Sequence, residues 1–352
     1  MGRYRSGTAR QDPPPAPAVS DAELGLIFAG AAAISIGASW RLVTSLERVG
    51  ARLNLSEALL GMLAALAADA PEITAAVTAL ARHQQSVGAG VVIGSNVFNL
   101  AALIGLAAVV GGSIALHPRV IELAGAVALW IAGVSLTVVT GVLSPLAGLV
   151  AVLAVLAPYV AILGMRHERL GRMALPGAWT RWLIAAITEE ELELEVAIHP
   201  RRGHARDALL ALGAVVVVVL ASVAMERSAS ELGTRHAVPG IVTGALVLAA
   251  VTSLPNAVAA VYLAMRGRGT AVLSTALNSN AFNILAGFLI PTTLLGQGAS
   301  SEQAIFVTAS YVAMTALALG FAYLGRGLHR GAGMVILAAY AVFAGVLLVI
   351  AY

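Results

Sequence analysis

Two apolar stretches of this 352-residue chain carry the same polar residue types at the same spacing. One runs from Pro71 to Asn99 and contains Pro-Glu followed by Gly-Ser-Asn-Val-Phe-Asn. The other runs from Pro255 to Asn283 and contains Pro-Asn followed by Asn-Ser-Asn-Ala-Phe-Asn. Carboxylate, hydroxyl and amide groups are costly inside apolar sequence, so they usually mark a binding or conduction path.

Helical geometry brings these polar residues to similar depth. A helix of about twelve residues rises about 18 Å, and after a short turn the following helix returns by the same amount. Ser95 and Asn99 are four residues apart and share one helical face, as do Ser279 and Asn283. With Glu72 at the same depth, these oxygens have the chemistry of a site for a hard cation.

The two prolines predict breaks in their helices. Pro71 cannot donate a hydrogen bond to the carbonyl of Ala67, and Pro255 cannot donate one to the carbonyl of Val251. Each break frees a backbone oxygen, and we expect these oxygens to add to the cation ligands.

The composition places these motifs in a membrane. Hydrophobic residues make up 59% of the chain, charged residues make up 11%, and the mean hydropathy is +0.89. Soluble domains have about 45–50% apolar and about 25% charged residues, so the chain is a polytopic membrane protein. Cysteine is absent, which leaves oxygen or histidine nitrogen to hold a cation. Ten apolar spans are expected, at about 24–46, 55–82, 86–110, 120–139, 142–165, 207–226, 237–265, 270–297, 303–325 and 332–352.

The repeat defines the fold class. Five spans, an odd number, separate equivalent points of the two copies, so the two halves have opposite orientations in the membrane. We therefore predict an all-α membrane protein with about ten transmembrane helices in two inverted five-helix repeats. The expected divisions are a mobile N-terminal segment at 1–20, a first repeat at 21–165, a cytoplasmic loop at 166–206 and a second repeat at 207–352.

Arginine sets the expected orientation, because lysine is absent. Fourteen arginines fall in the loops after odd-numbered spans and six fall on the opposite side, so the first set is expected in the cytoplasm. Both termini would then be external, in a protein of the cell membrane. Ser20 and Glu23 have capping-box spacing at the start of the first span. The acidic run from Glu189 to Glu195 is either solvated or a regulatory cation site.

These motifs resemble the two alpha repeats of the sodium/calcium exchangers, within the cation/Ca²⁺ exchanger superfamily. The resemblance implies ten helices in two inverted halves, with Na⁺ and Ca²⁺ competing for sites between the second, third, seventh and eighth helices. The ligands that it implies are Glu72, Ser95, Asn99, Thr252, Ser253, Ser279 and Asn283.

The chain departs from the family pattern at the acidic positions. Ala68-Asp69 stands where the family usually has Thr-Ser, and Asn256 stands where it usually has glutamate. Asp69 either replaces the missing carboxylate or bonds to backbone groups freed at the helix break. Asn256 is either a neutral ligand or a degenerate position. Asp69 and Glu72 together would neutralise a divalent ion or share a proton.

The preferred function is therefore a secondary active cation antiporter, similar to a sodium/calcium exchanger, with alternating access around a site at the membrane midplane. The alternative is a proton-coupled or monovalent cation exchanger. A channel would need a continuous pore lined by rings of ligands, and an intramembrane hydrolase would need a further catalytic constellation. The expected partners are the lipid bilayer and the transported cations, Ca²⁺ and Na⁺ or H⁺. No enzymatic activity, cofactor or nucleic acid is expected, and the sequence does not fix the oligomeric state.

Overall fold

The computed structural model describes residues 19–53, 57–163, 177–197 and 204–352. The helices and the strand of the first half of the chain are α1 (Asp21–Arg52), α2 (Glu57–Ala68), α3 (Ala70–Ala81), α4 (Gln85–Asn99), the π-helix η1 (Leu100–Leu106), α5 (Ala107–Gly111), β1 (Ser113–Ala115), α6 (Pro118–Val139) and α7 (Pro145–Leu163). The elements that follow are α9 (Gly177–Ala197), α10 (Ala205–Arg235), α11 (Gly240–Val242), the π-helix η2 (Thr243–Leu248), α12 (Ala249–Thr252), α13 (Leu254–Met265), α14 (Gly269–Phe282), the π-helix η3 (Asn283–Leu289), α15 (Ile290–Leu295), α16 (Glu302–Leu324), β2 (Gly327–His329) and α17 (Arg330–Ala351).

These elements confirm the ten expected spans. Within the described residues, eight helical stretches are long and apolar enough to cross a membrane, and two bent helix pairs complete the ten. The bends measure 50° between α2 and α3 and 48° between the α11–α12 stretch and α13. They occur at Asp69 and Ser253, just before the two prolines. The backbone angles at the two bends are nearly equal, with φ and ψ of −81° and −6° at Asp69 and of −83° and −4° at Ser253.

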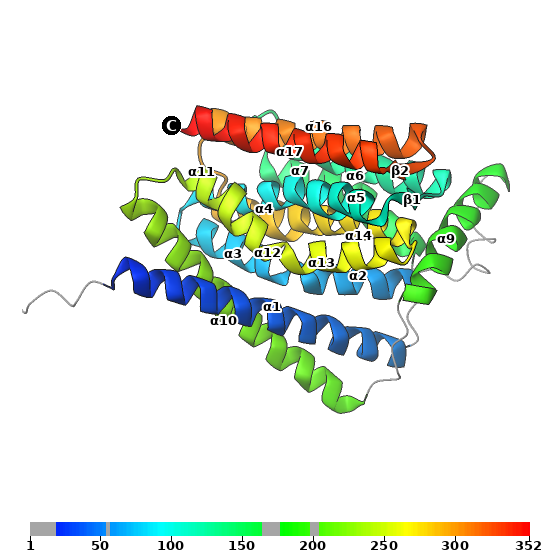
Figure 1. Cartoon of the computed structure of the whole chain (residues 1–352), viewed down its shortest axis with the longest axis horizontal. Helices are drawn as coiled ribbons and strands as arrows, with labels where there is room; N and C mark the ends of the chain where they lie inside the picture. Colours follow the sequence, from blue (N-terminus) through cyan, green and yellow to red (C-terminus); the bar gives the residue numbers. More distant parts are fainter. Residues whose placement is uncertain (1–18, 54–56, 164–176, 198–203) are drawn as a thin grey trace, which may run out of the picture.

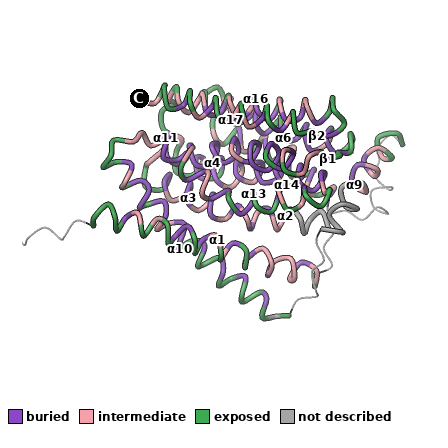
Figure 2. Tube along the Cα trace, viewed as in Figure 1, coloured by how far each residue is buried: buried purple, intermediate pink, exposed green. Residues whose placement is uncertain are grey.

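The motif helices form the centre of the molecule. Figure 1 shows α3, α4, α13 and α14 between the crossed pair α1 and α10 on one edge and the pair α16 and α17 on the other. Figure 2 shows the buried residues concentrated in this central layer. The most apolar window of the Gln85–Gly111 span is 89% buried, against 17% for that of α17. The polar residues of the motifs are therefore shielded from lipid by the outer helices.

Helices α1 and α10 pack against each other in antiparallel orientation (Figure 1). Midway along the pair, the Oγ atoms of Ser35 and Ser222 lie 3.0 Å apart. At one end, Arg48 forms an ion pair with Asp207 at 3.4 Å. These contacts hold the two long helices together along the edge of the central layer.

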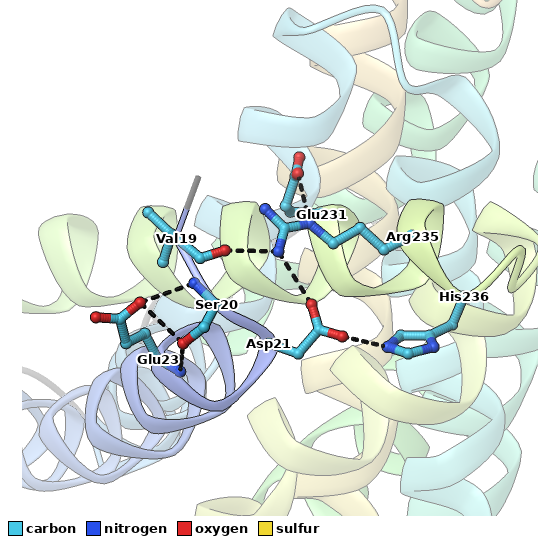
Figure 3. A network of polar contacts seen from close by, with 7 residues as sticks. All are labelled: Val19, Ser20, Asp21, Glu23, Glu231, Arg235 and His236. Atoms are coloured by element: carbon cyan, nitrogen blue, oxygen red, sulfur yellow. Dashed lines mark hydrogen bonds and ion pairs between the residues drawn. The ribbon is translucent and has the colours of Figure 1, made fainter. Parts of the chain in front are cut away.

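The other end of this helix pair is closed by the polar network of Figure 3. Arg235 donates to the Asp21 carboxylate at 3.0 Å, and His236 lies 3.0 Å from the second oxygen of the same carboxylate. Ser20 caps α1, since its hydroxyl accepts from the backbone N–H of Glu23 while the Glu23 carboxylate accepts from the backbone N–H of Ser20. The predicted capping box is therefore confirmed.

Two features differ from the sequence-based expectation. Part of the segment predicted as a loop, residues 166–206, forms helix α9. The side chains of the acidic run from Glu189 to Glu195 lie outside the described residues. Strands β1 and β2, which were not predicted, pair in antiparallel register with Ile114 opposite Leu328. Three-residue strands carry too short a pattern to be recognised in the sequence.

Candidate cation site

Two crossed pairs of side chains join the halves at the helix breaks. Asp69 Oδ1 accepts a hydrogen bond from Asn256 Nδ2 at 2.7 Å. Glu72 Oε1 accepts one from the hydroxyl of Ser253. Asp69 and Ser253 are equivalent positions of the repeat, and so are Glu72 and Asn256. The two pairs are therefore related by the pseudo-symmetry, and both carboxylates come from the first half.

Each carboxylate receives a second donor from the other motif helix of the second half. The Ser279 hydroxyl donates to Asp69 Oδ1 at 2.6 Å. Asn283 Nδ2 donates to Glu72 Oε2 at 2.6 Å. The second half thus supplies four neutral donors to the two carboxylates of the first half.

Four asparagines form the contact between α4 and the α14–η3 stretch. The Nδ2 atoms of Asn96 and Asn280 donate to each other's backbone carbonyls at 3.0 and 3.2 Å. Asn99 Nδ2 donates to Asn280 Oδ1 at 3.0 Å, and Asn283 Nδ2 donates to Asn96 Oδ1 at 3.2 Å. Exchange of the repeats maps this set of bonds onto itself. Asn96 and Asn280, which the family pattern does not place among the ligands, therefore join the two halves directly.

The site holds oxygens that lack a hydrogen-bond donor. They are Asp69 Oδ2, Ser95 Oγ, Asn99 Oδ1 and Asn283 Oδ1, and each is buried without a hydrogen-bond partner among the described residues. All four residues are fully buried. Buried oxygens without donors are unfavourable unless something electropositive approaches them. Their chemistry is that of ligands for a hard cation.

No arginine or histidine neutralises these carboxylates within the described parts of the chain. The ion pairs found there lie elsewhere, at Asp21, Asp207, Glu226 and Glu231. Two buried carboxylates without a fixed positive partner are costly in a membrane. With both groups ionised, the site would carry two negative charges, the number that balances one divalent cation.

Not every predicted residue joins this network. The hydroxyl of Thr252 donates to the carbonyl of Leu248 in its own helix at 2.9 Å, so no described contact brings it to the carboxylates. Ser95 is buried, but its hydroxyl makes no hydrogen bond with the other site residues. The bonds described above and a bond from Asn99 Nδ2 to Ser279 Oγ at 3.2 Å connect the remaining predicted residues, which are Asp69, Glu72, Asn99, Ser253, Asn256, Ser279 and Asn283.

The contacts of Asp69 bear on the interpretation that it bonds to backbone groups at the helix break. Its side chain makes no capping bond to the start of α3. The carbonyl of Ala67 accepts from the hydroxyl of Ser39 on α1 at 3.2 Å instead. That carbonyl, which was expected to serve as a cation ligand, therefore already has one hydrogen-bond donor. The sequence carries no repeated pattern around Ser39 that would have revealed this partner.

Both motifs continue into π-helices. The α-helical stretch of α4 ends at Asn99, where η1 begins with Leu100, and η3 begins at Asn283. A π-turn carries one extra residue per hydrogen-bonded loop and is frequent at functional sites. The last asparagine of each motif therefore sits at the change in helical pitch, which spacing alone did not predict.

A cavity of about 310 Å³ lies between α1, α2, α13 and α14 and borders the site at Asn256. Its inner wall includes Ser39, Ala68 and Asn256, and its outer part includes Glu47 and Tyr262. Ser39 and Glu47 are eight residues apart on α1, which corresponds to about 12 Å along the helix. The cavity therefore connects the end of α1 that holds Arg48 with the partner of Asp69.

The fold and this buried cluster define a polytopic membrane protein whose two inverted halves meet at a shared polar site. The chain matches the family described as "Sodium/calcium exchanger protein" over residues 23–166 and 207–349. It therefore belongs to the sodium/calcium exchanger family.

Two characterised relatives are similar over part of their length. The chain is 27% identical over 148 residues to the sodium/potassium/calcium exchanger Nckx30C of Drosophila melanogaster. The aligned segment covers 40% of this chain and 17% of that protein. It is 30% identical over 124 residues to sodium/potassium/calcium exchanger 4 of Mus musculus, which covers 32% of this chain and 20% of that protein. The matched segments thus span no more than a fifth of either relative.

Solved structures share the fold. The H⁺/Ca²⁺ exchanger CAX superposes with a TM-score of 0.67 at 14% identity, over 93% of this chain and 86% of that one. The sodium-calcium exchanger NCX_Mj superposes with a TM-score of 0.59 at 18% identity, over 92% of this chain and 98% of that one. The ten-helix arrangement in two inverted repeats is therefore confirmed.

Proposed function

We propose that this protein is a secondary active antiporter that exchanges Ca²⁺ for Na⁺ at the cluster around Asp69 and Glu72. The observation that carries the proposal is a pair of fully buried carboxylates with unpartnered oxygens around them and no fixed positive partner among the described residues. Such a site is stabilised when a cation occupies it. A site shared by two inverted halves suits alternating access, because each half offers its own path to the same ligands.

The proposed ligands are the residues that the two motifs bring together. Glu72 and Asp69 supply the charge, and the neutral oxygens come from Ser95, Asn99, Thr252, Ser253, Asn256, Ser279 and Asn283. Thr252 and Ser95 would join after a change of side-chain rotamer, since neither bonds to the carboxylates in this conformation. Asn256 acts as the neutral counterpart of Glu72.

A proton-coupled exchanger is the second candidate. Asp69 and Glu72 are three residues apart and both buried, so repulsion between two ionised carboxylates would favour a state in which they share one proton. A proton released on Ca²⁺ binding would then serve as the counter-ion.

Flux measurements with separate gradients test the two candidates. Purified protein in proteoliposomes is given external ⁴⁵Ca²⁺ with an outward gradient of Na⁺, H⁺ or K⁺, one at a time. We expect Ca²⁺ uptake only with the Na⁺ gradient. Uptake driven only by the H⁺ gradient would establish the second candidate, a requirement for K⁺ would match the transport named for the relatives, and no uptake under any gradient would refute both proposals.

We further propose that both termini face outward and that residues 166–206 are cytoplasmic, because fourteen arginines lie on that side and six on the other. The cysteine-free chain allows single cysteines at Arg5 and Gly203 to be labelled with an impermeant reagent. In intact cells, only the cysteine at position 5 should react. Reaction of the cysteine at position 203 would show that the protein has the opposite orientation.

A further inference from the structure

Glu47 has no role in the site described above, although it lines the cavity that leads there. It is the only charged residue among the described residues that line this cavity. Apart from Asn256, the other wall residues are small, apolar or hydroxyl-bearing, and Trp40, Val43 and Thr44 share the α1 wall with Glu47. A carboxylate half-buried in such surroundings loses hydration, so its presence requires a compensating interaction.

Among the described residues, only the charge of the adjacent Arg48 partly offsets this cost. No hydrogen bond or ion pair to the Glu47 carboxylate occurs within the described residues. The adjacent Arg48 pairs with Asp207 at 3.4 Å. Arg266, on the turn after α13, lies 4.4 Å from the centre of the Tyr262 ring. Two arginines at this end of the molecule thus have other partners, while Glu47 faces the cavity.

The repeat gives an independent reason to single out this position. Helices α1 and α10 begin at Asp21 and Ala205, which are separated by the repeat offset of 184 residues. The same offset relates Glu47 to Glu231. Because the halves are inverted, the two glutamates lie near opposite ends of the helix pair. Glu231 is bound to Arg235 at 3.0 Å, within the network that joins the ends of α1 and α10 (Figure 3).

The two equivalent glutamates therefore differ in their ion-pair partners. At the end of the helix pair shown in Figure 3, the glutamate is neutralised by Arg235. At the end where a cavity reaches Asn256, the glutamate has no described partner. The difference follows from the sequence, because Ala51 stands at the position equivalent to Arg235, and it leaves Glu47 as the charged residue of the cavity wall.

We propose that Glu47 is an outer cation-binding position that concentrates Ca²⁺ or Na⁺ at the mouth of the cavity before the ion reaches Asp69 and Glu72. This inference rests on the proposed transport function. Single negative charges in a low-dielectric cleft raise the local concentration of cations and their rate of arrival, and salt screens the effect. Glu47 acts on the approach of the ion and leaves its affinity for the central ligands unchanged.

The test compares transport from the two sides of the membrane. Initial rates of Ca²⁺ uptake are measured against Ca²⁺ concentration in everted vesicles and in intact cells, at low and high ionic strength, for the parent and Glu47→Gln. From the side onto which the cavity opens, we expect the half-saturating Ca²⁺ concentration to rise about threefold to tenfold at low ionic strength, with little change in the maximal rate. The difference should shrink at high ionic strength, and transport from the other side should be unchanged.

Two further variants separate charge from structure. Glu302→Gln removes an exposed carboxylate at the start of α16 and should match the parent. Thr44→Glu, placed in the Glu47→Gln background, returns a carboxylate to the same cavity wall about one turn away and should restore the parental half-saturating concentration. Such a rescue would also show that the effect of Glu47→Gln comes from the lost charge and not from poor insertion into the membrane.

Several results would overturn the proposal. They are an unchanged half-saturating concentration in Glu47→Gln, an equal change from both sides, or failure of Thr44→Glu to rescue. If the parent transports Ca²⁺ and Glu47→Gln behaves identically, only the role of Glu47 as an outer cation-binding position is refuted. If the parent shows no Ca²⁺ transport in the same vesicles, the proposed antiport function is refuted as well.

Discussion

Replacing Asp69 with asparagine tests whether this residue supplies the charge that the family pattern places at position 256. Asp69 is fully buried, its Oδ1 accepts two hydrogen bonds, and its Oδ2 has no partner in the described part of the chain. Asparagine keeps nearly the same size and an oxygen for those two donors, but it removes one of the two carboxylate charges. We expect Ca²⁺ binding to weaken more than Na⁺ binding.

The expected size of the effect follows from the charges. One carboxylate about 4 Å from a monovalent cation contributes about 4 kcal/mol at an effective dielectric constant of about 20, and a divalent cation gains about twice as much. Losing that carboxylate therefore costs Ca²⁺ about 4 kcal/mol more than Na⁺ before the site relaxes. Desolvation and the remaining oxygens offset much of this difference, so we expect Ca²⁺ affinity to fall relative to Na⁺ affinity by at least about tenfold, or about 1.4 kcal/mol.

Calorimetric titration of the purified protein in detergent measures both affinities. The parent and Asp69→Asn are titrated with Ca²⁺ and with Na⁺, and Glu122→Gln, which neutralises an exposed carboxylate on α6, is the control. Equal Ca²⁺ affinity in the parent and Asp69→Asn would refute the role of Asp69. A fall of equal size for both ions would also contradict the electrostatic reason, because charge acts twice as strongly on the divalent ion.

Two further predictions follow from the same contacts. The double variant Asp69→Ser/Asn256→Glu should bind Ca²⁺ nearly as well as the parent. The carboxylate moves from position 69 to position 256, whose side chains are joined by a 2.7 Å hydrogen bond in the parent, and the introduced serine becomes the donor to it. A loss of Ca²⁺ binding in calorimetry as severe as in Asp69→Asn would disprove this. Gly94→Ala should lower the thermal unfolding midpoint, because a Cβ at Gly94 would lie 2.4 Å from the Cα of Ala245 and such overpacking costs about 1–3 kcal/mol. Gly133→Ala, which meets nothing within 4 Å, should unfold at the parental temperature, and equal midpoints for both variants would contradict the packing argument.

Hydropathy and the repeat were sufficient to predict the main architecture. Apolar length predicted the spans, and Pro71 and Pro255 predicted the two bends, because a residue without an N–H interrupts a helix wherever it occurs. The π-helices after Asn99 and at Asn283 were not predictable from these patterns, since the change from one hydrogen-bonding offset to another leaves no periodic mark. Helix α9 was missed for another reason, because the polar composition of residues 166–206 indicated a loop.

The candidate site was predictable where both repeats carry the same signal. Paired spacing identified Ser279 and Asn283, which the structure joins to Asp69 and Glu72, whereas Ser253 was identified through the resemblance to the exchanger repeats. Contacts that occur in only one half were missed, because nothing in the other half repeats them. Ser39 is the clearest case, since its bond to the Ala67 carbonyl depends on the packing of α1 against α2.

The most direct test of cation exchange at the central site is Ca²⁺ flux through Glu72→Gln. The purified variant is reconstituted beside the parent, with insertion and folding verified by equal protein recovery and equal elution in size-exclusion chromatography. We expect Na⁺-driven ⁴⁵Ca²⁺ uptake in the parent and none in Glu72→Gln, because the change removes a buried charge while it preserves the size of the side chain. Uptake by Glu72→Gln at the parental rate would contradict transport through this site.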